Sequence, residues 1–472
     1  MGQTLFDKLW SSHSITRQQD GSELIYIDRI LLHERTGSVA LKSMEEEGLI
    51  VANPAQAFCV MDHILDTFTD RDDDTSMPSG TDFIRAHREG AKTFGMRLFD
   101  VNDDDQGIVH VISPEQAIVL PGLTVICPDS HTCTQGAFGA FAWGIGSTQA
   151  EHALVTETLG MTKPKNMRIT VSGALQEGVT AKDLILAIIA EESAAGAVGY
   201  VVEFCGPVVE AMTMEERMTI CNMAVEFSAF TAVIAPDEKT YAYLKGKPYA
   251  PSGVNWDAAV TEWHTLTSDK DATFDRDINF DATSLTNMVT WGTSPEHAAR
   301  ITSNVPNPAD ESDSAKRASL EKAMAYMAVT ADTPLTSLTL DAAFIGSCTN
   351  SRISDLRRAA AVLDGKHVAD GVKAICVPGS MKVRAEAEAE GLDQIFINAG
   401  FEWRKPGCSM CFYAGGEHFG HQERVITTTN RNFESRQGPK TRSHLASPEI
   451  VAASAIMGHI ADQHILEEAK NG

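Results

Sequence analysis

Short apolar runs alternate along the chain with longer segments typical of helices. The short runs predict strands at residues 24–27, 107–112, 123–126, 167–171, 343–345 and 374–377. The longer segments predict helices at residues 180–192, 213–227 and 351–363. Because strands alternate with helices, the pattern favours an α/β fold with largely parallel sheets.

A polar, turn-rich stretch interrupts this pattern between about residues 245 and 321. It contains the segments KGKPYAPSG, SDKDATFDRD and SNVPNPADESD, and we interpret it as a linker and excursion region. A softer break falls near residues 162–166. At about 150 residues per domain, a chain of 472 residues predicts about three domains. We expect them at residues 1–165, 166–290 and 291–472.

The charge balance restricts the classes of ligand. The chain has 39 basic and 64 acidic residues, a formal net charge of −25, which opposes general nucleic-acid binding. An anionic substrate would therefore need local Arg, Lys, His or a metal. The chain has no apolar run of about 18 residues and no secretory signal at its start, so we expect a cytoplasmic protein without a membrane segment.

The nine cysteines are expected to be thiols or metal ligands rather than disulfides. Cys408 and Cys411 form a C-x-x-C pair, and Cys348 directly follows a short apolar strand, where α/β folds bind ligands. A redox dithiol, a zinc site and buried core thiols are the alternatives, although zinc would need a second pair. Core packing accounts for the cysteines at positions 59, 205, 221 and 376. Three thiolates would leave one iron of a cubane cluster without a protein ligand, so that it is available as a Lewis acid.

Six motifs resemble the aconitase superfamily of iron–sulfur hydro-lyases. They are MDH (residues 61–63), DSHT (129–132), CNMAVE (221–226), GSCTNSR (346–352), PGCSMC (406–411) and NRNFESRQG (430–438). Within that superfamily the chain is most similar to the large-subunit family of bacterial isopropylmalate dehydratases. The resemblance implies a three-domain aconitase-like α/β/α core that lacks the swivel domain. We expect that domain to be a separate small subunit.

The resemblance also implies the roles of individual residues. Cys348, Cys408 and Cys411 would bind one [4Fe-4S] cluster per chain, with one iron not ligated by protein. The expected catalytic residues are Asp62, His63, His110, Asp129, His131 and Glu226. The expected substrate-binding residues are His33, Ser130, Asn222, Asn430, Arg431 and Arg436.

These residue types suit the implied chemistry. A His oriented by a carboxylate, as in Asp62–His63, can donate a proton to a leaving hydroxyl. Two arginines can grip the carboxylates of a dicarboxylate through paired hydrogen bonds. Asn222 and Glu226 are four residues apart, so a continuous helix would place them on one face. Taken alone, residues 129–131 also fit a capped turn, Glu226 fits a solvated helix face, and His33 fits a structural role.

The implied reaction is the isomerisation of 2-isopropylmalate to 3-isopropylmalate through 2-isopropylmaleate, in leucine biosynthesis. The base that removes the C–H proton in the family is a serine of the swivelling domain, so the isolated chain is expected to be inactive. Related substrates are the alternatives: citraconate or 2-methylmalate, dimethylmalate, a phosphonate analogue, homoaconitate or citrate. RNA binding, known for some cluster-free relatives, is disfavoured by the charge and by the absence of a basic stripe.

Several positions depart from the pattern of isopropylmalate dehydratases. They are Pro128, Gln135, Tyr200 and the segments 227–231 and 412–416. None of them is an expected cluster ligand or substrate arginine. The departures leave the hydro-lyase chemistry intact and leave open which substituent the substrate carries at C2.

Overall fold

The computed structural model describes residues 2–471, which form two compact units. The first unit comprises the residues up to Leu65 together with Arg71–Ala174 and Ala195–Thr283. The second comprises Asp66–Asp70, Leu175–Ala194 and the residues from Ser284 onward. No helix in the described range combines the length and apolar character needed to cross a bilayer.

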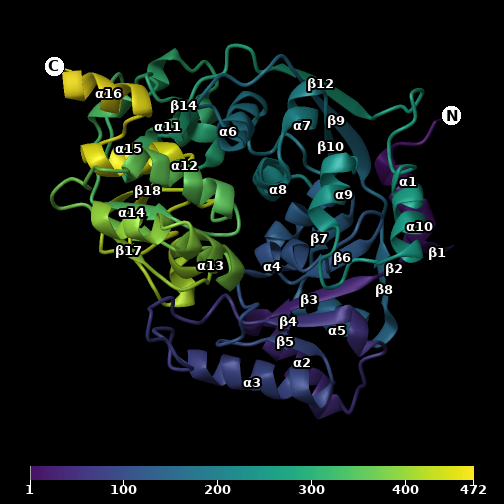
Figure 1. Ribbon diagram of the computed structural model, residues 1–472. Helices are drawn as coiled ribbons and strands as arrows, with labels where there is room; N and C mark the ends of the chain where they lie inside the picture. Colours follow the sequence, from purple (N-terminus) through teal and green to yellow (C-terminus); the bar gives the residue numbers. More distant parts are fainter. Residues whose placement is uncertain (1, 472) are drawn as a thin grey trace. The chain divides into compact units, whose positions relative to one another are not determined.

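A parallel five-stranded sheet organises the N-terminal part of the first unit, in the order β5-β4-β3-β6-β7 (Figure 1). The strands are β3 (Arg29–His33), β4 (Ala57–Val60), β5 (Arg97–Phe99), β6 (Thr124–Cys127) and β7 (Phe141–Gly144). The helices that accompany them are α2 (Glu34–Glu47), α3 (Gly80–Thr93), α4 (Val109–Glu115) and α5 (Ser147–Thr156). The central strand β3 leads directly into α2, which packs side by side with α3. Because all five strands are parallel, their carboxyl ends share one edge of the sheet.

Two further sheets complete the first unit. One is antiparallel, in the order β1-β2-β8, with β1 (Ser14–Arg17), β2 (Glu23–Tyr26) and β8 (Thr158–Met161). The other is parallel, in the order β11-β10-β9-β12, with β9 (Lys165–Ser172), β10 (Tyr200–Cys205), β11 (Thr231–Val233) and β12 (Arg276–Asp281). The remaining helices are α1 (Leu5–His13), α7 (Pro207–Ala211), α8 (Met214–Met223), α9 (Glu238–Leu244) and α10 (Val254–Trp263). Helix α8 begins at a Thr213–Glu216 capping box, which pairs the unsatisfied N–H groups of its first turn.

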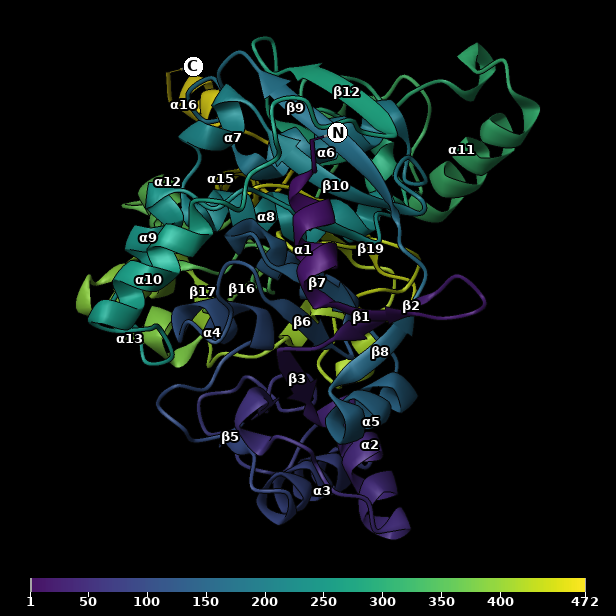
Figure 2. The same ribbon diagram turned by 90° about the vertical axis from the view of Figure 1, so that its right-hand side faces the viewer.

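The second unit is built on another parallel sheet, in the order β17-β16-β15-β18-β19. Its strands are β15 (Ala342–Ile345), β16 (Lys373–Cys376), β17 (Phe401–Trp403), β18 (Arg424–Thr427) and β19 (Arg442–Leu445), and β13 (Met288–Thr290) pairs separately with β14 (Ala298–Arg300). Its helices are α6 (Ala181–Glu192), α11 (Ser314–Met327), α12 (Ile353–Leu363), α13 (Met381–Ala389), α14 (Leu392–Ala399), α15 (Pro448–Met457) and α16 (Gln463–Asn471). Helix α15 packs against β15 and β18, whereas α11 extends outward at the upper right of Figure 2.

The predicted α/β class is confirmed, and most predicted elements are present. The strands predicted at 24–27, 123–126, 167–171, 343–345 and 374–377 correspond to β2, β6, β9, β15 and β16. The helices predicted at 180–192 and 351–363 correspond to α6 and α12.

The strand predicted at residues 107–112 is wrong, because this segment enters helix α4. All residues from Val109 to Pro114 are buried in that helix. A short apolar run that is buried on every side has no helical periodicity, so sequence pattern alone cannot separate it from a buried strand. The correction matters because α4 carries His110.

Two other expectations need correction. The helix predicted at 213–227 ends at Met223 and continues as a 3-10 helix, η3 (Ala224–Phe227). The polar stretch 245–321 is not only a linker, since it contains α10 and β12, and β12 pairs with β9 in a parallel sheet. Each predicted domain contains one large parallel sheet, and the three-domain division stays a prediction.

Candidate active site

The carboxyl ends of three neighbouring strands carry the candidate acid–base residues of the first unit. Strand β3 ends at His33, β4 is followed by Asp62 and His63, and β6 is followed by Asp129. Since these strands are parallel neighbours, their ends meet at one edge of the sheet, which is where α/β folds bind ligands. The structure therefore brings together residues that are nearly 100 positions apart in the sequence.

Asp129 is the centre of this group. One carboxylate oxygen, Oδ1, accepts hydrogen bonds from the backbone N–H of His131 at 2.6 Å and from His110 Nε2 at 3.1 Å. The other oxygen, Oδ2, lies 3.0 Å from His63 Nε2. Burial by itself would raise the pKa of this carboxyl, but the hydrogen bonds from the three histidines outweigh it and hold the pKa well below its usual range. Asp129 is therefore an ionised carboxylate.

His63 lies between two carboxylates. Its Nδ1 is 2.7 Å from Asp62 Oδ1, and its Nε2 is 3.0 Å from Asp129 Oδ2. Burial opposes ionisation of Asp62, yet His63 beside it holds the pKa of that carboxyl below its usual range. An ionised carboxylate only accepts hydrogen bonds, so both contacts form only when both ring nitrogens carry a proton. This geometry favours His63 as an imidazolium, a group that has a proton to give.

A buried layer supports the Asp62–His63 pair. The ring of His33 stacks on that of His63 with centroids 3.8 Å apart, and its Nε2 lies 3.0 Å from the carbonyl oxygen of Pro128. Burial, aided by the nearby His63, lowers the pKa of His33 to about 4, so that ring is neutral. Glu34 accepts the N–H groups of Asp62 and Ile64 at 3.1 and 2.5 Å. The structure places His33 behind His63, as a supporting ring.

The residues His33, Glu34, Asp62 and His63 form a buried group whose potential metal-ligand atoms lie within 4.8 Å of one another. The contacts described above already engage each of these side chains, with partners in the loops after β4 and β6. Sequence reasoning missed Glu34. Its signal was a carboxylate directly after a buried strand, at the first position of a helix.

The 3-10 helix η2 (Ser130–Phe138) and the end of α8 supply the next residues. His131 Nε2 lies 3.0 Å from Glu226 Oε1, and Asn222 donates to Thr134 Oγ1 at 2.8 Å. Because α8 ends before Glu226, the two residues reach η2 from different helical segments rather than from one continuous face. Ser130 is half-buried, with its Oγ 3.5 Å from His131 Nδ1.

Gln135, one of the atypical positions, lies behind His110. Its Nε2 donates to Ser113 Oγ at 2.8 Å and lies 3.5 Å from His110 Nδ1. An amide NH₂ group only donates, so His110 Nδ1 faces it as an acceptor and His110 Nε2 donates to Asp129. Gln135 thereby supports one tautomer of His110.

We expect His87 to make the first unit acid-sensitive. This fully buried histidine of α3 has its pKa lowered to about 3 by burial, with a further contribution from His33. Below pH 6.5, the ordinary value, the unfolded chain takes up a proton that the folded chain excludes, so stability falls as the pH falls towards 3. Between pH 7 and pH 5 this group costs about 2 kcal/mol of unfolding free energy.

Chemical denaturation of wild type and His87→Leu at both pH values measures that contribution. The variant is expected to lose about 2 kcal/mol less than wild type over this interval, whatever its stability at pH 7. Equal losses in the two proteins would show that His87 is protonated in the folded state.

In the second unit, the cysteines occupy the carboxyl edge of its parallel sheet. Cys348 follows β15, the C-x-x-C pair follows β17, and Asn430 follows β18. Cys348, Cys408 and Cys411 are 7, 6 and 7% exposed, and none of the chain's nine cysteines forms a disulfide. Burial raises the pKa of the thiols of Cys59, Cys221 and Cys376, as expected of core cysteines.

The surroundings of the sulfurs test whether these residues fit a cluster. Asn430 Nδ2 donates to the Cys348 sulfur at 3.5 Å, and Arg436 Nη2 donates to the Cys411 sulfur at 3.7 Å. N–H donors, one of them cationic, favour thiolates over thiols, and thiolates are the ligands of iron–sulfur clusters. Three buried cysteines, with donors directed at two of their sulfurs, fit a [4Fe-4S] cluster.

Two buried cationic side chains hydrogen-bond to the backbone of the loops that carry Cys348 and Asn430. Arg352, 2% exposed, donates to the carbonyl oxygens of Cys348 and Thr349 at 2.9 and 2.8 Å. Lys182, fully buried in α6, donates to the carbonyl oxygens of Thr428 and Thr429, just before Asn430, at 3.0 and 2.6 Å. Sequence reasoning missed both. The signal for Lys182 was a lysine in the first turn of a helix whose next residues, from Leu184 to Ala190, are all apolar.

The two predicted substrate arginines lie in the segment after β18. Arg431 is half-buried. The guanidinium of Arg436 lies over two phenyl rings, 5.4 Å from the centroid of Phe412 and 5.2 Å from that of Phe433. Two aromatic rings near the guanidinium restrict its orientation by cation–π attraction. Phe412 belongs to the atypical segment 412–416, so that departure directly contacts a predicted substrate residue.

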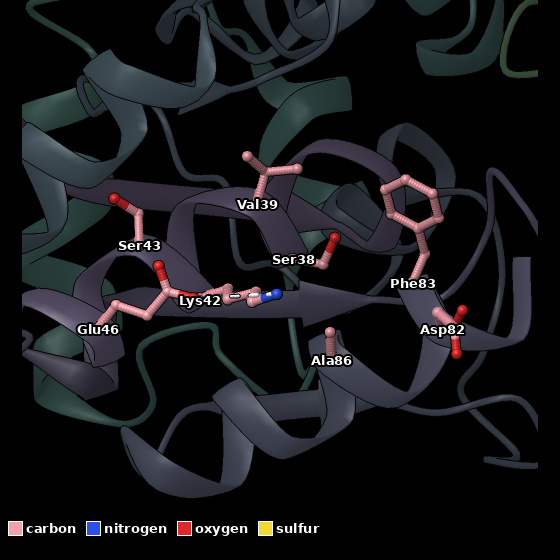
Figure 3. Close-up of a pocket in the computed structure, with 8 residues that line it drawn as sticks. All are labelled: Ser38, Val39, Lys42, Ser43, Glu46, Asp82, Phe83 and Ala86. Carbon is pink, nitrogen blue, oxygen red and sulfur yellow. Dashed lines mark ion pairs between the residues drawn. The ribbon is translucent and has the colours of Figure 1, made fainter. Parts of the chain in front are cut away.

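Two concave surfaces lie apart from these groups. A groove of about 460 Å³ between α2 and α3 is lined by Ser38, Val39, Lys42, Ser43, Glu46, Asp82, Phe83 and Ala86 (Figure 3). A polar hollow of about 420 Å³ in the second unit is lined by Ala325, Tyr326, Gln422, Glu434, Ser435, Lys440 and Arg442. None of the predicted site residues lines either surface. The candidate site is therefore argued from the two groups of side chains described above, the acid–base residues of the first unit and the cysteines of the second.

Comparisons with known proteins show the family of the chain. A model of the aconitase family (aconitate hydratase) matches residues 7–458. The chain is 48% identical over 466 residues to 3-isopropylmalate dehydratase large subunit 1 of Bradyrhizobium diazoefficiens, and the match covers 99% of this chain and 97% of that relative. A crystal structure of Thermococcus kodakaraensis aconitase X in its holo-form is similar with a TM-score of 0.45 and 12% identity, over 87% of this chain and 84% of that one. Because the family match spans nearly the whole chain and the Bradyrhizobium relative shares almost half of its residues, the chain belongs to the aconitase family and is a hydro-lyase.

Proposed function

We propose that the chain is the cluster-binding large subunit of an isopropylmalate dehydratase, which isomerises 2-isopropylmalate to 3-isopropylmalate in leucine biosynthesis. Membership of the aconitase family implies a [4Fe-4S] cluster. The observation that carries the proposal is that one chain contains both three buried cysteines with N–H donors directed at two of their sulfurs, and a histidine held between two carboxylates. The name of the Bradyrhizobium relative, a large subunit of this enzyme, supports the choice of substrate.

Cys348, Cys408 and Cys411 would hold the cluster, with one iron left without a protein ligand. When bound, such a cluster supplies a Lewis acid for a substrate hydroxyl and carboxylate. The charge of the thiolates is partly balanced by Arg436, whose N–H is directed at the Cys411 sulfur. The chain's own residues supply the proton transfers and the substrate binding.

His63 is the proton donor of the proposed mechanism. Its Nδ1 proton is held by Asp62, whose side chain is fully buried, whereas Nε2 faces Asp129, whose side chain is 18% exposed. Nε2 is therefore the nitrogen that delivers a proton to the departing hydroxyl group. The two carboxylates keep the ring charged before transfer and hold it in one orientation, and rehydration returns the proton.

The remaining residues bind and orient. Arg431 and Arg436 would anchor the two carboxylates of the substrate, which a protein with a net charge of −25 needs local cations to attract. Asn430 and Ser130 would add hydrogen bonds. Glu226, whose carboxylate lies 3.0 Å from His131 Nε2, would handle the water that leaves and returns. The base that removes the C–H proton would come from a separate small subunit.

A related C2-substituted malate is the second candidate substrate. The observation that favours it is the contact between Phe412 and Arg436. Phe412 is an atypical aromatic residue, and it lies next to an arginine that we predict to bind a substrate carboxylate. A second phenyl ring, that of Phe433, lies 5.2 Å from the same guanidinium. These rings would change the space available to the substituent at C2, as in 2-methylmalate or dimethylmalate.

Substrate preference tests the proposal. The chain is co-produced with its small subunit, reconstituted anaerobically, and offered 2-isopropylmalate, 2-methylmalate, citraconate and cis-aconitate. We expect the highest kcat/KM for 2-isopropylmalate, above 2-methylmalate by about 10-fold or more, since a pocket built for the larger group loses apolar contact with the smaller one. The chain alone is expected to show no turnover. Preference for citraconate would assign the second candidate, and activity of the chain alone would contradict the divided active site.

A further inference from the structure

The backbone between the two cysteines of the C-x-x-C pair is in an unusual conformation. Ser409, which follows Cys408, has φ +47°, in the left-handed region. Residues with a side chain seldom adopt this region unless their surroundings impose it. The short 3-10 helix η7 (Ser409–Cys411) begins at this residue, so its conformation sets the direction of the chain between the two sulfurs.

A buried carboxylate is directed at Ser409. Glu417, 6% exposed, accepts a hydrogen bond from the Ser409 hydroxyl. The same carboxylate accepts the backbone N–H of Thr67 at 2.6 Å and the Thr67 hydroxyl at 2.8 to 2.9 Å. The hydroxyls of Thr67 and Ser409 are themselves 3.1 Å apart. In each of its contacts with these residues Glu417 accepts a hydrogen bond. An ionised carboxylate can accept all of them, whereas the NH₂ group of an amide can only donate.

The charge of Glu417 is balanced by Arg404. Arg404 Nη1 donates to Glu417 Oε2 at 3.2 Å, and both side chains are nearly inaccessible, at 5 and 3% exposure. The same guanidinium pairs on its outer side with Glu402, whose side chain is 48% exposed. Lys405 also donates its backbone N–H to the Thr67 carbonyl at 2.8 Å. Residues on both sides of the C-x-x-C pair are therefore tied to the segment Asp66–Asp70.

We propose that Glu417 is a positioning residue of the cluster loop, whose carboxylate, held by Arg404 and Thr67, fixes Ser409 in the conformation that presents Cys408 and Cys411 to the cluster. This inference rests on the proposed function, because it requires these two cysteines to be ligands. Glu417 itself touches neither cluster nor substrate. Its effect passes through Ser409 to the direction of the two thiolates.

Replacing Glu417 by glutamine tests the proposal. The amide has the same shape, but its NH₂ group must face a donor and the charge opposite Arg404 is lost. Residues that orient metal ligands typically contribute 10- to 100-fold to affinity, so we expect iron to leave the anaerobically reconstituted cluster for a chelator about 10- to 100-fold faster than in wild type. The electron paramagnetic resonance spectrum of the reduced cluster is expected to shift as well.

Glu402→Gln is the matched control. It removes a carboxylate from the same arginine, but on the exposed side and without contact to Ser409. We expect its iron release and spectrum to match wild type. The double variant Ser409→Gly with Glu417→Gln separates positioning from general stability, because glycine adopts a left-handed conformation without support. Starting from Ser409→Gly, the Glu417→Gln change is expected to accelerate iron release much less.

Three results would overturn the proposal. These are wild-type iron release in a folded Glu417→Gln protein, equal effects of Glu402→Gln and Glu417→Gln, and an undiminished effect of Glu417→Gln in the Ser409→Gly background. If Glu417→Gln does not fold, Ser409→Ala, which removes only the hydroxyl, is expected to accelerate iron release, and its failure to do so would overturn the proposal. An unaltered chain that takes up no cluster would instead overturn the proposed function.

Discussion

Replacing Cys408 by serine is expected to reduce cluster content and hydro-lyase activity to background. Cys408 belongs to the buried three-cysteine edge of the second unit, and a hydroxyl does not replace a thiolate as a cluster ligand. Iron and acid-labile sulfide per chain, measured after anaerobic reconstitution, check the first effect. Turnover of 2-isopropylmalate by the complex with the small subunit checks the second.

Cys205→Ser is the matched control for this loss. Cys205 is a half-buried thiol on β10, 3.4 Å from the Thr170 hydroxyl, and it belongs to no predicted ligand set. We expect the control to retain wild-type iron, sulfide and activity. A Cys408→Ser protein that keeps a full cluster would show that the ligand set has been assigned incorrectly.

Replacing His63 by glutamine is expected to lower kcat by about 10²- to 10⁴-fold, the usual contribution of a positioned acid or base. Glutamine can still hydrogen-bond with Asp62 or Asp129, but it has no proton to give at neutral pH. Cluster content is expected to stay at the wild-type level, because His63 belongs to the first unit and is not a predicted ligand. Steady-state kinetics and iron analysis of the same sample check both statements.

His13→Gln provides the comparison for His63. Its Nε2 lies 2.8 Å from Asp28 Oδ2, and its side chain is 10% exposed, as is that of His63. The His13–Asp28 pair resembles the proposed catalytic pair, Asp62–His63, in chemistry, but His13 lies at the end of α1. We expect this variant to change stability rather than kcat. A His63→Gln enzyme with wild-type kcat would remove His63 from the role of proton donor.

The residues that the sequence pointed to directly are those at the ends of strands. Cys348 and Asp129 follow short apolar runs, and in a parallel sheet such positions share one edge, so their proximity could be predicted. The position of His110 was predicted on a wrong element, because the apolar run around it is buried on all sides in α4. The pattern of apolar residues located the strands before Cys348 and Asp129. It failed around His110 because a fully buried helix and a fully buried strand have the same apolar pattern.

The supporting residues could not be predicted in the same way. Glu34 and Glu417 are carboxylates in contexts that usually face solvent, and their partners are backbone N–H groups or hydroxyls far along the chain, such as Thr67 for Glu417. Only the fold shows that these carboxylates are buried. Likewise, His33 was expected to contact substrate, whereas the structure stacks it behind His63. Its contact with substrate stays a prediction.

The measurement that tests the central claim most directly is turnover of 2-isopropylmalate as a function of cluster content. The complex of this chain with its small subunit is reconstituted anaerobically to several levels of iron and sulfide, and the rate is measured at each level. The account predicts that the rate rises in proportion to the number of [4Fe-4S] clusters per chain and vanishes without them. A rate that does not depend on cluster content, or no turnover at full cluster occupancy, would contradict it.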